Sequence, residues 1–162
     1  MSKGKESKEE EIKMFEPLPN KKYNIILMDP PWSYDNFQSV PKTDKNKGSV
    51  SSQYPTVSVE DLKNYPLQII ADDDCLLFMW ATFPKLQEAL DLVKHYGFEY
   101  KTCAFAWAKT QKHKGTWVSG MGFYTKSNIE IVLLGRKGNF ERKSNTVRQL
   151  LVAPLGKHSA KP

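Results

Sequence analysis

The sequence predicts a single α/β domain with a doubly wound, mostly parallel sheet. Residues 23–28 (YNIILM) and 75–81 (CLLFMWA) are short continuous apolar runs, which are typical of strands buried on both faces. Helical patterns separate and follow these runs, and such alternation predicts right-handed crossovers with helices on both faces of a parallel sheet. The chain has 162 residues, 40% of them hydrophobic, which is enough for one domain with a real core.

The N-terminal part of the chain is polar and precedes that core. Residues 1–22 alternate acidic and basic side chains, so we expect a disordered or loosely docked arm before one domain over residues 23–162. Residues 33–57 are also polar and show no periodicity. Loops of this length in compact domains are usually functional, and we expect this one to gate a substrate site.

Capping signals define two helices. Ser58 opens an S-x-x-D pattern that predicts a helix through about residue 71, bent near Pro66. Thr82 is the expected cap of a second, strongly amphipathic helix, and Gly97 stands just past its end. Beyond the first strand, four apolar runs predict the remaining strands, at residues 75–81, 100–108, 129–134 and 147–153.

Chemically informative residues follow the ends of three predicted strands. They read DPPW at 29–32, WATFP at 80–84 and WAKT at 107–110. Ligands of open α/β sheets bind outside the carboxyl ends of the strands, so all three segments should lie on one rim. Trp80 and Trp107 could instead be plain core residues. Lys109 could face an anionic substrate or be a surface lysine that extends to solvent.

The run Asp29-Pro30-Pro31-Trp32 forms a rigid polar turn with an aromatic neighbour. It suits a flat heteroaromatic ring with an exocyclic amine, such as adenine, whose amine lone pair is delocalised into the ring. A site that methylates this amine must accept both N–H protons, and the Asp29 carboxylate and Pro30 carbonyl can do so, since proline has no N–H donor. Trp32 can stack on the ring. An ordinary turn is the alternative, because Asp-Pro and Pro-Pro are common turn dipeptides.

Positive charge is concentrated in the C-terminal part of the chain. Residues 1–99 carry 12 Lys/Arg against 16 Asp/Glu, whereas residues 100–162 carry 12 against 2. This asymmetry indicates a polyanionic partner, although a solvated basic face is the alternative. Residues 110–126, together with Lys109, combine lysines, glycines and aromatics without an acidic residue, which favours nucleic acid over a mobile solvated loop. The candidate contacts are Lys109, Lys112, Lys114, Trp117, Phe123, Tyr124 and Lys126.

Several other classes of protein are disfavoured. Cys75 and Cys103 lie in apolar runs, where reduced buried thiols are usual. The three histidines lack metal-ligand spacing, so we expect no metal, and no hydroxyl–histidine pairing is arranged for nucleophilic catalysis, so we expect no acyl-transfer chemistry. No apolar run approaches the roughly 18 residues that span a bilayer, and the N-terminus lacks the apolar core of a signal peptide. We therefore expect a soluble protein that is not exported.

The chain resembles the MT-A70 family of S-adenosylmethionine-dependent adenine N6-methyltransferases, particularly its short bacterial and phage forms. The resemblance implies a Rossmann-like, methyltransferase-like fold, and a cytoplasmic protein of a bacterium or of a phage host. It covers about residues 23–162 and rests on NIILMDPPW, LLFMWAT, FAWAKT, GMGFYTKSNIEIVLLGRKG and VRQLLVAPLGKHSAKP.

The resemblance also assigns roles to individual residues. It implies a catalytic, amine-binding pocket made by Asp29, Pro30, Pro31 and Trp32, with Asp29 and Pro30 close to the cofactor's sulfonium. Lys161 matches the family lysine that binds the methionine carboxylate of S-adenosylmethionine. Asn128 and Glu130 match a family N-x-E segment near the cofactor. Residues 111–126 correspond to a region that contacts nucleic acid.

One departure concerns the C-terminal end. Members of the family normally continue past the Lys-Pro pair into a helix, an ELF-x-R strand and a Gly-Trp and Gly-Asn segment, which hold the cofactor's ribose and adenine. No such run occurs in this sequence. We therefore expect a domain that is incomplete at its C-terminus, either as a fragment or as a degenerate member.

The activity implied by the resemblance is methyl transfer from S-adenosylmethionine to N6 of adenine in nucleic acid. DNA is expected over RNA, because the short bacterial and phage forms are mostly treated as DNA enzymes. Two alternatives remain, a catalytically silent nucleic-acid-binding subunit and an RNA adenine N6-methyltransferase. A protein-amide methyltransferase is disfavoured, because Asp rather than Asn begins the DPPW run.

Overall fold

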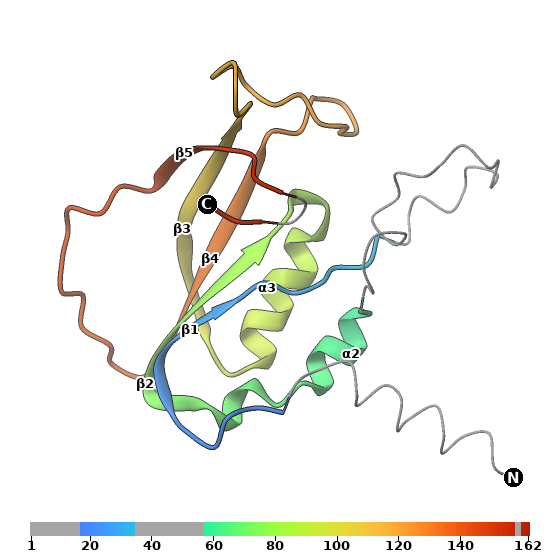
Figure 1. Cartoon of the computed structure of the whole chain (residues 1–162). Coiled ribbons are helices and arrows are strands. Elements are labelled where there is room, and N and C mark those ends of the chain that lie inside the picture. The colour runs from blue at the N-terminus through green and yellow to red at the C-terminus, as the bar shows by residue number, and fades with distance from the viewer. Residues whose placement is uncertain (1–16, 35–56, 158–159) are drawn as a thin grey trace, which may run out of the picture.

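The computed structural model describes residues 17–34, 57–157 and 160–162. It is an α/β structure in which one sheet of five strands has the spatial order β1-β2-β4-β3-β5 (Figure 1). The strands are β1 (Tyr23–Met28), β2 (Ala71–Ala81), β3 (Glu99–Thr110), β4 (Ile129–Lys137) and β5 (Leu150–Pro154). Most of the expected arm (residues 1–22) and most of the expected gating loop (residues 33–57) lie outside the described residues.

The sheet is mixed, which corrects the prediction of a mostly parallel sheet. β1 pairs in parallel with β2, and β3 with β5, whereas β4 is antiparallel to both β2 and β3. Four strands therefore run in one direction, and β4 runs against them from between β2 and β3. The reason is the connection from β3 to β4, which contains no helix in residues 111–128. A chain that returns without a crossover pairs with its predecessor in the antiparallel sense.

The first predicted helix is shorter than expected. α2 (Val59–Asn64) begins at its cap Ser58, whose side chain accepts a hydrogen bond from the Asp61 N–H at 3.1 Å. It ends before Tyr65, which has the extended backbone that the following Pro66 favours. A 3₁₀ turn, η3 (Leu67–Ile69), follows, and β2 begins directly afterwards.

The second predicted helix is confirmed with a different start. Another 3₁₀ turn, η4 (Phe83–Lys85), precedes α3 (Leu86–His95), and Gly97 ends the segment with φ of 82°. The Thr82 side chain makes no capping bond; its hydroxyl lies 2.6 Å from the Tyr34 hydroxyl instead. Ala89, Leu92 and Val93 are fully buried against the sheet.

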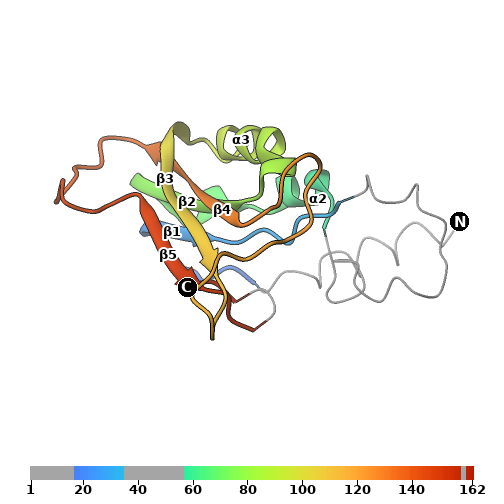
Figure 2. The same ribbon diagram turned by 90° about the horizontal axis from the view of Figure 1, so that it is seen from above.

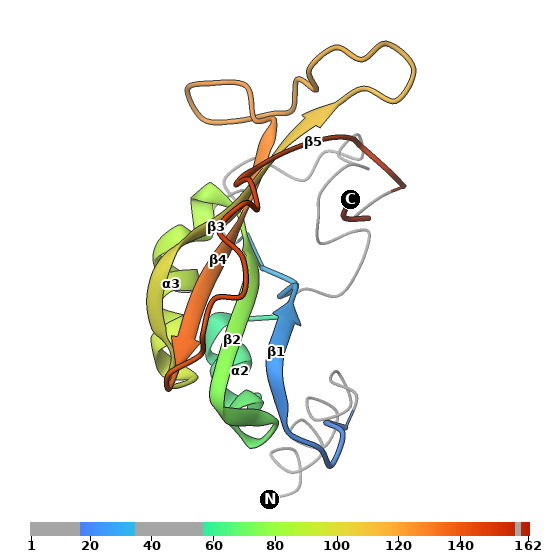
Figure 3. The ribbon, with the colours of Figure 1, turned by 90° about the vertical axis from the view of Figure 1, so that its left-hand side faces the viewer.

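Both α-helices lie on the same face of the sheet (Figures 2 and 3). The expectation of helices on both faces is therefore not met in the described part of the chain. The opposite face carries a smaller cluster built on Trp80, Trp107 and Val132, and the segment after β5 runs along that side. Ile25 and Leu27 of the edge strand β1 are exposed, so the prediction that this strand is buried on both faces is wrong.

Cys75 is buried and Cys103 is partly buried, and both are free thiols. Burial raises the pKa of each thiol.

Of the helices that the structure describes, none is long and apolar enough to span a membrane.

Candidate functional site

The carboxyl ends of β1, β2 and β3 meet at one edge of the sheet and surround a cavity of about 730 Å³. All three segments that the sequence placed on one rim contribute to it. A cavity of this size is within the range of small-molecule sites. Its lining combines strand ends, the start of β4 and the segment after β5: Asp29, Pro30, Pro31, Trp32, Tyr34, Trp80, Ala81, Thr82, Trp107, Lys109, Glu130, Leu155, Gly156, Lys157, Ala160 and Lys161.

The Asp-Pro-Pro-Trp run folds into a tight turn. The Trp32 N–H donates to the Pro30 carbonyl at 2.9 Å, which closes a three-residue turn around Pro31. Proline's fixed φ suits this geometry. The Pro31 carbonyl accepts the Val57 N–H at 2.9 Å. A carbonyl oxygen has two lone pairs, so Pro30 retains one acceptor site after its bond to Trp32.

Trp32 is more deeply buried than a side chain that only stacks on a substrate ring would be. Its side chain is part of the main core and the residue is only 5% exposed. The indole Nε1 donates to the Trp80 carbonyl at 3.3 Å. This bond joins the turn after β1 to the end of β2, so Trp32 fixes the shape of the cavity as well as lining it.

Four charged side chains alternate in sign across the cavity. Lys161 Nζ lies 2.9 Å from Asp29 Oδ2 and 3.5 Å from Glu130 Oε2. The other oxygen of Glu130 is 2.5 Å from Lys109 Nζ. The Lys109 and Glu130 side chains are 16% and 20% exposed, so water screens this pair less than a surface pair. Asp29 and Lys109 were predicted from their positions at strand ends, and Glu130 and Lys161 from the resemblance to a family; the structure brings all four together.

Each lysine of this network also lies over a tryptophan ring. Lys161 Nζ is 5.3 Å from the Trp80 ring centroid, and Lys109 Nζ is 5.1 Å from that of Trp107. The two rings meet edge to face, 6.1 Å apart. Trp80 and Trp107 are therefore both buried core residues and walls of the site, where each attracts a lysine cation.

The network sets the protonation of Lys161. Burial alone would lower its pKa, but the hydrogen bond to Asp29 and the charge of Glu130 outweigh burial, and the pKa is raised. The raised pKa favours the cationic form of Lys161, which lines the cavity.

The lining offers a ligand both a cationic group and anionic or carbonyl oxygens. A carboxylate can bind Lys161, while an ammonium or a sulfonium is compatible with the oxygens of Asp29, Glu130 and Pro30. A second cavity, of about 470 Å³ and mostly apolar, meets Asp29, Pro30 and Pro31 from the other side of the turn. Among the described residues, no group of three or more His, Cys, Asp or Glu could hold a metal ion.

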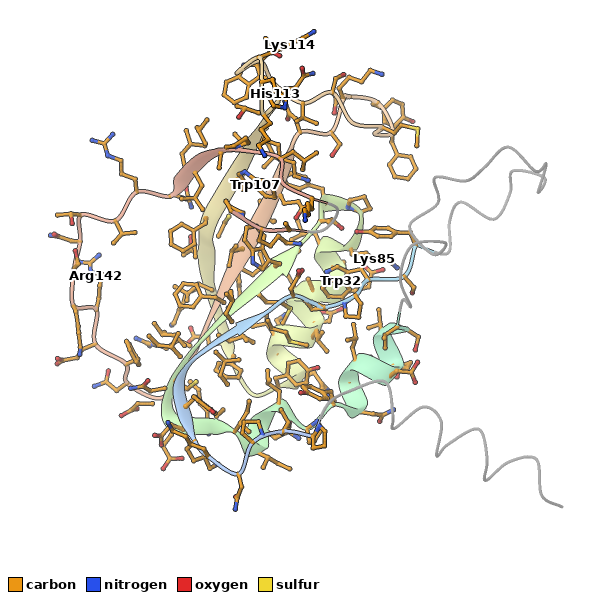
Figure 4. All side chains as sticks on the ribbon, viewed as in Figure 1. Trp32, Lys85, Trp107, His113, Lys114 and Arg142 are labelled. Atoms are coloured by element: carbon orange, nitrogen blue, oxygen red, sulfur yellow. The ribbon has the colours of Figure 1, made fainter. Side chains whose placement is uncertain are left out.

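The remaining predicted residues lie away from the cavity. Asn128 does not line it; its carbonyl accepts the Lys109 N–H at 2.9 Å, which helps to place that lysine. The candidate contact Lys114 lies next to His113 at the outer end of the segment that follows β3 (Figure 4). The other candidate nucleic-acid contacts, Lys112, Trp117, Phe123, Tyr124 and Lys126, belong to the same exposed segment.

Sequence reasoning gave Glu130 a minor place, whereas the structure puts it between two lysines. A signal was available, because Glu130 is one of only two acidic residues after position 99. The bond between Tyr34 and Thr82 had no such signal. It joins two loops whose proximity depends on the parallel pairing of β1 and β2.

A family model described as MT-A70 matches residues 23–162. The chain is 39% identical over 162 residues to the type II methyltransferase M.MunI from a Mycoplasma species, an alignment that covers 92% of this chain and 66% of that protein. It is 26% identical over 119 residues to an N(6)-adenosine-methyltransferase MT-A70-like protein from Drosophila melanogaster. It is 27% identical over 139 residues to the N6-adenosine-methyltransferase non-catalytic subunit MTB from Arabidopsis thaliana. The fly and plant alignments cover 73% and 83% of this chain, but only 17% of each relative.

Proposed function

The chain belongs to the MT-A70 family, and from this we propose that it transfers a methyl group from S-adenosylmethionine to N6 of adenine in DNA. One observation carries the proposal. Asp29 and Pro30 line the same cavity as three tryptophans and three lysines. We further propose that residues 23–162 form one Rossmann-like, methyltransferase-like domain, because four strands of like direction present the cavity at their carboxyl edge.

The acceptor side of the reaction follows from Asp29 and Pro30. Their oxygens accept the two N–H groups of the adenine amine, so that its lone pair turns out of the ring plane and becomes nucleophilic. Two aligned acceptors also hold the reacting nitrogen in place, which removes part of the entropic barrier. As the new N–C bond forms, the nitrogen becomes positively charged, and the nearby Asp29 carboxylate stabilises that charge until the nitrogen loses one proton to water.

The cofactor side depends on Lys161. When bound, S-adenosylmethionine supplies an electrophilic methyl group on a sulfonium whose thioether departs with the bonding electron pair. Lys161 holds the carboxylate end, and Asp29 and Pro30 face the positive centre. Lys161 already lies over the Trp80 ring and is paired with Glu130, so its side chain needs little reorganisation to bind the cofactor's carboxylate. No covalent intermediate with the protein is needed.

We propose DNA as the polymer for two reasons. The 39% identical relative is named a type II methyltransferase, a term of DNA modification enzymes. The segment from 110 to 128 has no acidic residue and exposes lysines and aromatic rings, and it follows β3, whose end lines the cavity with Lys109. In a duplex the target adenine must leave the stack to reach Asp29, at a cost of a few kcal/mol.

The test is methylation of DNA by the purified chain. Genomic DNA without adenine methylation is incubated with S-adenosylmethionine that carries a deuterated methyl group, and labelled N6-methyladenine is measured by mass spectrometry. We expect label with the wild type and almost none with Asp29→Asn. Asp91→Asn is the matched control, since Asp91 lies on the exposed side of α3 and bonds Gln87. Label in RNA or in a glutamine-bearing peptide, but not in DNA, would contradict the proposal.

A further inference from the structure

The segment between β3 and β4 folds into two separate turns. The first, residues 111–116, is closed by the pair Thr110 and Trp117 and contains Gly115 with φ of 62°. The second, residues 121–126, is closed by Gly120 and Ser127, whose N–H and carbonyl groups bond in both directions at 2.9 and 3.2 Å. We call them the basic turn and the apolar turn, because their side chains differ in kind.

The apolar turn presents large side chains to solvent. Met121 is 88%, Phe123 70% and Tyr124 103% exposed. The backbone beneath them is tightly shaped, since a Cβ on Gly122 would lie 2.1 Å from the Thr125 carbonyl oxygen. Projecting apolar groups on a defined backbone mark an interaction site rather than a random loop.

The surrounding charge indicates what kind of partner these groups meet. The basic turn carries Lys112, His113 and Lys114, Lys126 ends the apolar turn, and no acidic residue occurs in residues 110–128. Lysines of this kind bind phosphates and set the position of a protein on nucleic acid. Apolar wedges such as Phe and Met, in contrast, insert between base pairs and unstack them. Lysines beside exposed apolar side chains therefore favour duplex DNA over a protein partner.

The position of the two turns relates them to the cavity. Both extend from the end of β3 and the start of β4, which is the edge where Lys109 and Glu130 line the cavity (Figures 3 and 4). An adenine that leaves a duplex for this cavity leaves an empty space in the stack. We propose that the apolar turn inserts into duplex DNA and fills the space vacated by the flipped adenine, while the basic turn holds the adjacent phosphates. This inference rests on the proposed function.

The first test needs no cofactor and no knowledge of the target sequence. Binding to two fluorescent duplexes is compared, one fully paired and one with a single tetrahydrofuran abasic site in place of an adenosine. The wild type should bind the abasic duplex roughly tenfold more tightly, because the space is already open and a stacked aromatic contact is gained. The triple variant Met121→Ser, Phe123→Ser, Tyr124→Ser should lose that preference. The double variant Lys112→Ala, Lys114→Ala should weaken binding to both duplexes. It should still prefer the abasic duplex.

The second test measures methylation of mixed-sequence genomic DNA, native and heat-denatured. The loss of activity in the triple variant should be at least about tenfold greater on native DNA than on denatured DNA, where no stack must be opened. Equal losses of activity on both DNAs, or no loss on either, would overturn the proposal that the apolar turn inserts into the duplex. Equal losses together with a change in sedimentation would instead identify the turn as a contact between protein copies. If the wild type binds the abasic duplex preferentially but methylates neither DNA, the proposed function is overturned, whereas the insertion of the apolar turn is still supported.

Discussion

Lys161 Nζ lies 2.9 Å from Asp29 Oδ2, so the lysine proposed to hold the cofactor's carboxylate is paired with the carboxylate proposed to orient the target amine. The pair couples the two halves of the proposed reaction, because a ligand that hydrogen-bonds to this oxygen must compete with Lys161 for it. Glu130 contacts the same lysine and gives it a second partner when the first is engaged.

Replacement of Asp29 by asparagine should reduce DNA methylation by about 100-fold or more, since loss of one positioned electrostatic partner costs on the order of 10²–10³ in kcat. The amide keeps the size of the side chain but loses its charge. Stability should change by less than about 1 kcal/mol, because the Asp29 side chain is 47% exposed and such ion pairs contribute little. Initial rates by mass spectrometry and urea unfolding would be measured on the same preparations. Unchanged methylation would exclude Asp29 from the reaction.

Replacement of Glu130 by glutamine should destabilise the protein by about 1–3 kcal/mol, because it leaves two partly buried lysines without their shared carboxylate. Lys109 loses its 2.5 Å partner, and Lys161 keeps only Asp29. The matched control is Glu60→Gln, whose ion pair with Lys63 on α2 is largely exposed and should not measurably affect unfolding. Urea denaturation of the three proteins compares them directly. Equal stability of both variants would show that the cavity network contributes no more than a surface pair.

Alkaline pH should remove the stabilisation that Lys161 provides. Its pKa is raised in the folded protein, so the folded state holds the proton more tightly than the unfolded state does. The contribution is therefore fully present below the unfolded pKa of about 10.4 and is lost as pH rises through the higher folded pKa. Burial also raises the pKa values of Tyr96, Cys75 and Cys103. Ionisation of these groups at alkaline pH therefore destabilises the folded protein as well.

The measurement must therefore use a difference between two proteins. Unfolding free energies of the wild type and Lys161→Met would be determined from neutral pH to about pH 11, near the upper limit set by lysine and tyrosine ionisation. The difference between them should be constant up to about pH 10 and shrink above it. A difference that grows with pH, or does not change, would show that Lys161 is not held by Asp29 and Glu130.

Local sequence signals predicted the elements well where the cause is local. The strand at residues 23–28 has the predicted bounds, Ser58 caps α2, and Gly97 adopts the positive φ expected after a helix. The start of β2 was missed because Asp72, Asp73 and Asp74 disfavour strand structure. These carboxylates are exposed there, where the strand extends into water.

The site was less predictable because its geometry depends on pairing between distant segments. Antiparallel register sets Trp107 opposite Glu130, and this brings Lys109 beside the same glutamate. A parallel sheet, which the alternation of strands and helices predicted, would not have created that pair. The contact of Lys161 with Asp29 likewise joins residues that are far apart in the sequence, and no local pattern encodes it.

Gly135 is a position on β4 where the strand packs closely against Val93 of α3 and against Phe98. A Cβ at this buried position would lie 2.9 Å from Val93 Cγ1 and from Phe98 Cβ. Gly135→Ala should therefore force the helix and strand apart and destabilise the protein by about 1–3 kcal/mol, the usual cost of overpacking. Val93→Ala alone should cost about 1–2 kcal/mol through lost burial. Because removal of Val93 Cγ1 makes room for the new methyl group, the double variant should lose less stability than the sum of the single variants. Strictly additive losses in urea denaturation would show that the added methyl group does not press on the helix.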